Sequence, residues 1–190
     1  MRKKLGLWMI VLISLLAACG GDIETNMSED VKDFKFTTQD NEKLSQDDLE
    51  GEWWVANFIF TNCTTVCLPM TSNMSLLQSK MEEENIDAQL VSFTVDPEHD
   101  TPSVLKDYAK SYDANLDNWS FLTGYDFDTI KELSVTSFRS LIVEAQPGTD
   151  QVTHGTKFFL INPEGKVIKQ YDGVAKSEMD AIIEDLKAVM

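Results

Sequence analysis

The chain has 190 residues, with 32 acidic and 16 basic side chains and a formal net charge of −16 at neutral pH. This balance argues against nucleic-acid binding, because phosphate recognition requires clustered lysine and arginine. Negative charge of this size attracts cations and basic partners, and it also keeps an exported protein soluble.

The N-terminus has the pattern of an export signal. A basic start at residues 2–4 precedes an apolar run over residues 5–16, which is shorter than the roughly 20 residues of a membrane-spanning helix. The sequence Leu-Ala-Ala then leads to Cys19, which is similar to the cleavage site of bacterial lipoproteins. This similarity implies a signal peptide over residues 1–18 and a diacylglycerol anchor on Cys19. The alternative is an uncleaved N-terminal anchor, and both place the rest of the chain outside the cytoplasm.

The next segment predicts a connection between the membrane and one domain. Residues 20–32 are short, polar and acidic, as in a flexible tether that follows Cys19. Residues 33–190 have the length of a single domain with one core. Removal of the signal leaves 13 basic against 32 acidic side chains, a formal charge of −19.

Two dense apolar runs, residues 52–60 and 88–95, predict buried strands. Between them a helix is predicted from Pro69 onward, because apolar residues recur there at steps of four, three and four. These residues are Met70, Met74, Leu77 and Met81. Helical spacing favours core packing for this stripe over a metal site made of thioethers.

The second half of the chain alternates helices and short strands. Thr101 and Pro102 form a good N-cap and first-turn pair for a helix over residues 103–112. The remaining predicted elements are a strand near residues 119–122, a helix around 126–133, an exposed loop over 144–153, a β-hairpin from 157–161 to 166–171, and a closing helix with an apolar face from Met179 to Leu186.

This order predicts an α/β fold of the thioredoxin-like class. We expect a central mixed sheet flanked by helices, with an inserted helix–strand segment and a C-terminal β-hairpin. In such folds the reactive loops lie at the carboxyl ends of parallel strands. Cys63 follows one predicted strand and Asp96 ends another, so the two are expected to lie close together if the strands are neighbours.

Cys63 and Cys67 are the most informative pair. A structural disulfide is one possible role, but a loop with a three-residue spacer gains little entropy from cross-linking. If Cys67 lies in the first helical turn, both sulfur atoms point to one place. The helix N-terminus is then expected to lower the thiol pKa, and thiolates are soft ligands suited to Cu(I) or Zn.

His154 is the candidate imidazole partner of Cys63 and Cys67. In a thioredoxin fold, the segment that enters this strand lies opposite the cysteine pair and usually carries a cis-proline. Here the nearest upstream proline is Pro147, and His154 occupies the segment instead. Two thiolates and one imidazole make a three-coordinate site natural for Cu(I) and adaptable to Cu(II). His99 lies in a polar turn and is expected to be solvated.

Four motifs lie in a fixed order between residue 34 and the end of the chain. They are Phe-Thr-Asn-Cys-x-x-x-Cys at 60–67, Ser-Phe-Thr-Val-Asp-Pro-Glu-x-Asp-Thr-Pro at 92–102, Leu-Thr-Gly at 122–124, and His154 before an apolar strand and an Asn-Pro-Glu-Gly turn. Together they closely resemble the Sco/SenC family. The family usually has proline directly after the second cysteine, where this chain has Leu68 and then Pro69, which a first helical turn tolerates.

The resemblance implies a membrane-anchored, thioredoxin-like protein that binds copper through Cys63, Cys67 and His154. Asp96 is then a carboxylate beside the site that orients or modulates the metal. The resemblance also implies a role in assembling the dinuclear copper-A centre of cytochrome c oxidase, with subunit II as the partner and a copper donor upstream. We expect a monomer, lipid-anchored at the extracytoplasmic face of the cell membrane.

Three functions fit the residues. The first is a copper metallochaperone, which binds and transfers its ion without turnover as an enzyme. The second is a thiol–disulfide reductase that keeps the cysteines of the oxidase reduced, with Cys63 as the attacking thiol. The third is a peroxiredoxin-like peroxidase or redox sensor. His154 discriminates among them, because only a copper chaperone requires the imidazole.

Overall fold

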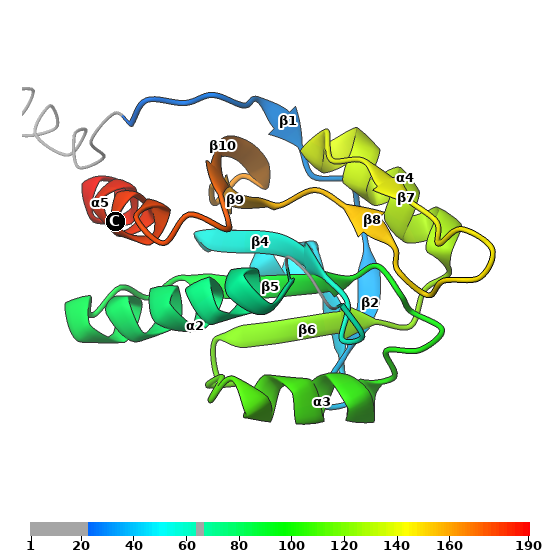
Figure 1. The fold of residues 1–190 in the computed structure, drawn as a ribbon. Coiled ribbons are helices and arrows are strands. Elements are labelled where there is room, and N and C mark those ends of the chain that lie inside the picture. The colour runs from blue at the N-terminus through cyan, green and yellow to red at the C-terminus, as the bar shows by residue number, and fades with distance from the viewer. Residues whose placement is uncertain (1–22, 64–66) are drawn as a thin grey trace, which may run out of the picture.

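The fold is built on one large mixed β-sheet (Figure 1). The computed structural model describes residues 23–63 and 67–190. Within this part of the chain, eight strands lie in the order β1-β10-β9-β4-β5-β6-β2-β3, and β7 and β8 form a separate pair. The strands are β1 Glu29–Asp30, β2 Lys35–Thr38, β3 Lys43–Ser45, β4 Trp54–Ile59, β5 Gln89–Thr94, β6 Trp119–Thr123, β7 Ile142–Val143, β8 Thr153–His154, β9 Lys157–Ile161 and β10 Lys166–Asp172.

β4 lies at the centre of the sheet, which explains its apolar sequence. It pairs in parallel with β5 and antiparallel with β9, and β5 pairs in parallel with β6. All six residues of β4 are buried, as expected for a strand covered on both faces. Trp54 and Phe58 belong to one core cluster, whereas Val55 and Ile59 belong to the other.

Helices cover both faces of this sheet (Figure 1). The helices α2 (Cys67–Glu84), α3 (Pro102–Ser111) and α5 (Glu178–Val189) pack on one face, and α4 (Phe127–Phe138) packs on the other. A short 3-10 helix, η1, spans Asp47–Leu49. The predicted apolar stripe of α2, including Met70, Met74 and Met81, is fully buried against the sheet, so its spacing reflects core packing.

The predicted thioredoxin-like α/β fold is confirmed by the order of these elements. The two dense apolar runs form the neighbouring strands β4 and β5, the inserted helix–strand segment lies between β5 and the hairpin, and β9 and β10 form the C-terminal β-hairpin. Helix α4 extends to Phe138, beyond the predicted end near residue 133. The hydrophobic signal of the extension is weak, because its buried positions are Ser134, Ser137 and a single apolar residue, Phe138.

The folded domain begins earlier than the sequence predicts. Residues 20–32 have the composition of a tether, but from Asn26 onward this stretch is bonded to the sheet. The amides of Asn26 and Met27 donate to the carbonyl of Ile168 at 3.1 and 3.0 Å, and β1 pairs with β10. Val31 is buried in the core. Main-chain hydrogen bonds hold the segment, so its polar side chains give no periodic signal.

Candidate metal centre

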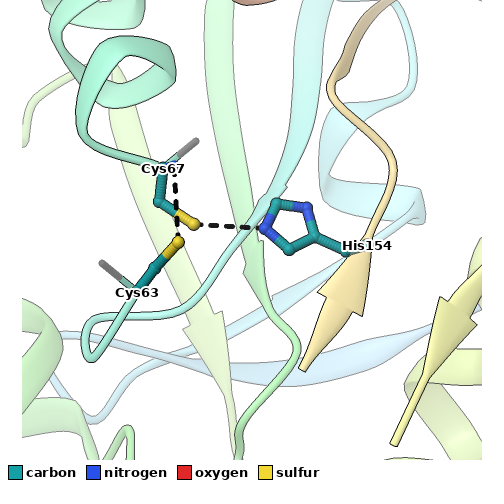
Figure 2. A group of neighbouring side chains, drawn as sticks. All are labelled: Cys63, Cys67 and His154. Atoms are coloured by element: carbon teal, nitrogen blue, oxygen red, sulfur yellow. Dashed lines mark hydrogen bonds between the residues drawn. The ribbon is translucent and has the colours of Figure 1, made fainter. Parts of the chain in front are cut away.

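Cys63 lies in the loop that follows β4, and Cys67 begins α2 (Figure 2). The amide of Cys63 donates to the Phe60 carbonyl at 3.4 Å, which turns the chain directly after β4. Cys67 is the first residue of α2, and its amide donates to Sγ of Cys63 at 3.4 Å. Both residues are buried thiols. The start of the helix therefore brings the two sulfur atoms close together.

His154 faces the cysteines from β8 (Figure 2). Its Nε2 lies 3.1 Å from Sγ of Cys67, and its Nδ1 lies 2.8 Å from the Gly155 carbonyl. A carbonyl only accepts, so Nδ1 carries a hydrogen and donates to Gly155, which leaves Nε2 directed at the sulfur. The Phe60 ring packs edge-on against the imidazole with centroids 5.8 Å apart. The ring is thus held with one nitrogen aimed at the cysteines.

The three side chains form a donor group of metal-site dimensions. The ligand atoms of Cys63, Cys67 and His154 all lie within 4.8 Å of one another. Metal–donor bonds of about 2.0–2.3 Å place the donors of a three-coordinate ion about 4 Å apart, so small side-chain movements suffice to close the site. Two sulfurs and one imidazole suit Cu(I), Cu(II) or Zn(II) better than a hard cation such as Mg²⁺.

Burial governs the protonation of Cys67. The sequence predicts that the helix N-terminus lowers the thiol pKa, and this prediction is wrong for Cys67 in the protein without metal. Removal from water is the largest effect and raises the pKa of Cys67 far above the ordinary range for a thiol, and the contact with Cys63 adds to the rise. Cys67 is 1% exposed, so the loss of hydration outweighs the potential of the helix.

We expect the stability of the thiol form to decrease at alkaline pH. The folded-state pKa of Cys67 is raised above the unfolded value of about 8.5, so above that pH the folded chain holds a proton that the unfolded chain releases. The contribution of Cys67 to the free energy of unfolding is therefore fully present below the unfolded pKa. It is lost as the pH rises from the unfolded pKa toward the higher folded pKa. Urea unfolding between about pH 7 and pH 10 measures the slope, which should be smaller in Cys67→Ser. Equal slopes in the parent and the variant would contradict this assignment.

Asp96 and His99 follow the end of β5 and lie outside the donor group. Within residues 23–63 and 67–190, the cluster with metal-ligand spacing consists of the two cysteines and His154. Asp96 is half-buried beyond β5, and its pKa is raised by burial and by the neighbouring Asp100. His99 is exposed, as predicted from its polar turn.

Asp100 is a buried residue near the site, although its place in a polar turn of the sequence gave no sign of burial. It is 0% exposed, and its carboxylate accepts hydrogen bonds from the Thr61 amide at 3.1 Å and the Thr61 hydroxyl at 2.5 Å. The Thr94 hydroxyl donates to the same carboxylate. Asp100 therefore connects the end of β5 to the loop that carries Cys63. The pairing of β4 with β5, each followed by polar residues, is the one signal that could have indicated it.

Two hydrogen bonds join the Cys63 loop to the loop that precedes His154. The side-chain amide of Asn62 donates to the Asp150 carboxylate, and Nε2 of Gln151 donates to the Asn62 carbonyl at 3.1 Å. Hydrogen bonding, chiefly from Gln151, lowers the pKa of Asp150. These contacts align two segments that are nearly 90 residues apart in the sequence.

The predicted lipid-bearing residue, Cys19, and the spacer residues 64–66 lie outside the described residues. Leu68, which replaces the usual proline, is 51% exposed, and Pro69 lies in the first turn of α2, where its missing N–H leaves no helical bond unmade. Within the described part of the chain, no helix combines the length and apolar character needed to cross a bilayer.

Several known proteins are similar to this chain. The SCO1 protein homolog of Bacillus subtilis is 46% identical over 189 residues, covering 99% of this chain and 97% of the relative. A SCO1/SenC family lipoprotein from Bacillus anthracis superposes with a TM-score of 0.81 at 44% identity, covering 85% of this chain and 95% of that structure.

Two further solved structures bear on the chemistry of the site. The structure of BsSco, described with a disulfide switch and as a member of the Sco family of cytochrome c oxidase assembly proteins, has a TM-score of 0.79 at 45% identity and covers 87% of this chain and 97% of its own. Copper-bound yeast Sco1 has a TM-score of 0.68 at 27% identity, covering 85% and 91%. The SCO1/SenC family model matches residues 24–190. The chain therefore belongs to the SCO1/SenC family.

Proposed function

We propose that the protein is a copper metallochaperone that supplies copper to the dinuclear copper-A centre in subunit II of cytochrome c oxidase. The observation that carries the proposal is Nε2 of His154, which lies 3.1 Å from Sγ of Cys67 and is grouped with Cys63. The copper bound in yeast Sco1 supports the choice of metal, and the description of BsSco as an oxidase assembly protein supports the destination.

The donor group suits an ion that is held and then passed on. Copper binding displaces the thiol protons, so affinity and proton release are linked. Three donors leave the ion short of four-coordination, and a ligand from the partner is able to bind before one of the protein's own donors leaves. Each bond to the partner then replaces a bond to Cys63, Cys67 or His154, and the released thiols regain protons. No electron transfer is required.

The proposal places the protein at the extracytoplasmic face of the cell membrane. The export signal over residues 1–18 and the lipid on Cys19 supply the anchor, and the similar lipoprotein from Bacillus anthracis supports this arrangement. The protein acts as a monomer that receives copper from an upstream donor. Asp96, half-buried after the strand beside β4, modulates the site from outside the donor group.

A thiol–disulfide reductase is the second candidate, and one contact favours it. The Cys67 amide donates to Sγ of Cys63, which stabilises negative charge on that sulfur and supports the choice of Cys63 as the attacking thiol. Its thiolate attacks one sulfur of a partner disulfide, and Cys67 resolves the mixed disulfide. The partner leaves with two thiols, and the chain keeps a Cys63–Cys67 disulfide. The disulfide switch described for BsSco supports this chemistry, whereas burial of both cysteines disfavours a peroxidase.

We expect His154→Ala to weaken copper binding by at least about a hundredfold, because losing even an outer partner of a ligand costs about 10–100-fold. Competition titration of the reduced protein measures the affinity, and sulfur-to-copper charge-transfer absorption reports the Cu(II) form. His99→Ala is the matched control and should bind copper like the parent, since His99 is exposed and outside the donor group.

Disulfide reduction is measured on the same variants with a peptide that carries a disulfide. The chaperone proposal fails if His154→Ala binds copper like the parent while Cys63→Ala loses disulfide reduction. Loss of copper binding in His154→Ala, with disulfide reduction retained, identifies the imidazole as a group that only metal binding needs.

A further inference from the structure

Asp100 is a buried carboxylate whose neighbours all donate to it. Its Oδ1 accepts from the Thr61 hydroxyl, and its Oδ2 accepts from the Thr61 amide and the Thr94 hydroxyl. The Thr94 oxygen accepts in turn from the Asp96 amide at 3.1 Å, so its own hydrogen is free to point at Asp100. Three donors around two acceptor oxygens is the arrangement of a carboxylate anion.

No cation lies against this carboxylate within residues 23–63 and 67–190. The ion pairs of the described chain all involve other acidic side chains, most of them on the surface. Asp100 is 0% exposed, so water does not screen its charge. The negative charge of Asp100 acts on the donor group, because it adds to the rise in the pKa of Cys67 that burial causes.

The same residue fixes the position of Cys63. Thr61 is two residues before Cys63, and both its amide and its hydroxyl are bonded to Asp100. The Cys63 amide is bonded to the Phe60 carbonyl, so the turn from Phe60 to Cys63 is held at both ends. Asp100 thus acts on the donor group through its charge and through Thr61.

The charge of the occupied site depends on the oxidation state of copper. Two thiolates and a neutral imidazole give a net charge of zero with Cu(II) and −1 with Cu(I). A fixed negative charge nearby destabilises the Cu(I) form relative to the Cu(II) form, and the low dielectric of a buried site strengthens this effect. The ratio of the two affinities reports it independently of the protonation state of the metal-free thiols.

We propose that Asp100 is a positioning residue of the copper site, which holds the Cys63 loop through Thr61 and biases the site toward Cu(II). This inference rests on the proposed copper binding and adds the oxidation state that the site prefers.

Asp100→Asn removes the charge and keeps the hydrogen bonds. The remaining carbonyl oxygen accepts from the Thr61 amide and the Thr94 hydroxyl, while the new NH₂ donates to the Thr61 hydroxyl, which is able to accept. We expect the ratio of Cu(II) affinity to Cu(I) affinity to fall by about tenfold, the order of effect of one charge at moderate distance in a protein. Competition with a chromophoric chelator for each ion measures the two affinities.

Matched variants separate charge from position. Thr61→Val removes one hydroxyl bond and keeps the charge, so it should weaken both affinities together and leave their ratio unchanged. Asp107→Asn changes an exposed side chain of α3 and controls for the net charge of the protein. It should leave the ratio of the two affinities at the parent value. Asp100→Ser is a second neutral variant if Asp100→Asn folds poorly, because a hydroxyl both donates and accepts hydrogen bonds.

The outcomes are distinguishable. If the parent binds neither ion, the proposed function fails. If the parent binds both and Asp100→Asn and Asp100→Ser keep its ratio, the inference about Asp100 is overturned while copper binding stands. An equal shift of the ratio in Thr61→Val also overturns it, because position and not charge would then set the preference. A lost sulfur-to-copper charge-transfer band in Asp100→Asn also overturns it, because the thiolates would then no longer hold the ion and the ratio would not report the charge alone.

Discussion

Cys63→Ser and Cys67→Ser are each expected to lower copper affinity by more than about a hundredfold and to abolish the sulfur-to-copper absorption of the affected bond. The reason is the change from a soft thiolate to a hydroxyl that remains protonated and is a poor ligand for copper. Serine is close to cysteine in size, so the packing around these two buried positions is preserved. Copper titration with absorption spectroscopy measures both effects.

The methionines of α2 provide the control for the cysteine variants. Met74 is 0% exposed and packs against the sheet in the α2 core cluster. Met74→Leu preserves volume and should cost less than about 1.5 kcal/mol of stability without changing copper affinity. A large loss of copper binding in this variant would contradict the assignment of the α2 stripe to core packing.

Phe60→Ala is expected to reduce the free energy of unfolding by about 3–5 kcal/mol and to weaken copper binding in the protein that remains folded. Phe60 is 1% exposed, and its ring packs edge-on against His154. Its carbonyl also accepts the Cys63 amide. Removing the ring leaves a cavity beneath the site and frees the imidazole to turn away from Cys67. Denaturant unfolding and copper titration below the transition measure the two effects separately.

Phe121→Ala separates the loss of stability from the effect on the site. Phe121 is equally buried, but it lies on β6 and stacks on Trp119, two strands away from β4. The cost in stability should be similar, about 3–5 kcal/mol, and copper affinity should be unchanged in the folded protein. If both variants lost copper affinity alike, the contact between Phe60 and His154 would have no special role.

The sequence predicted those parts of the fold that depend on hydrophobic periodicity. The buried strands β4 and β5, the apolar stripe of α2 and the β9–β10 hairpin all carry patterns that one segment displays alone. The strands β1, β7 and β8 were not predicted, because strands of two residues are too short to show a period. Their existence depends on main-chain hydrogen bonds to partners far away in the sequence.

The candidate site shows the same division between local and tertiary signals. The spacing of Cys63 and Cys67 and the place of His154 before β9 were sufficient to group these residues. Asp100 was missed because its burial depends on the loop after β4, about 40 residues earlier in the chain. The sequence indicates a lowered pKa for Cys67, whereas the structure raises it, because a spacing pattern contains no information about the loss of water around the sulfur.

The distance along the chain between Cys67 and His154 determines when the site comes into existence. The two residues are 87 positions apart, and the strand after His154 must insert beside β4 before the imidazole reaches the sulfur. Contacts of such long range form late and slowly in folding. A chain that emerges N-terminus first exposes its two cysteines well before its histidine, so an unfinished chain has no three-donor site. The full three-donor affinity therefore belongs to the completed domain, and copper stabilises the native state to the extent that it binds that state more tightly than the unfolded chain.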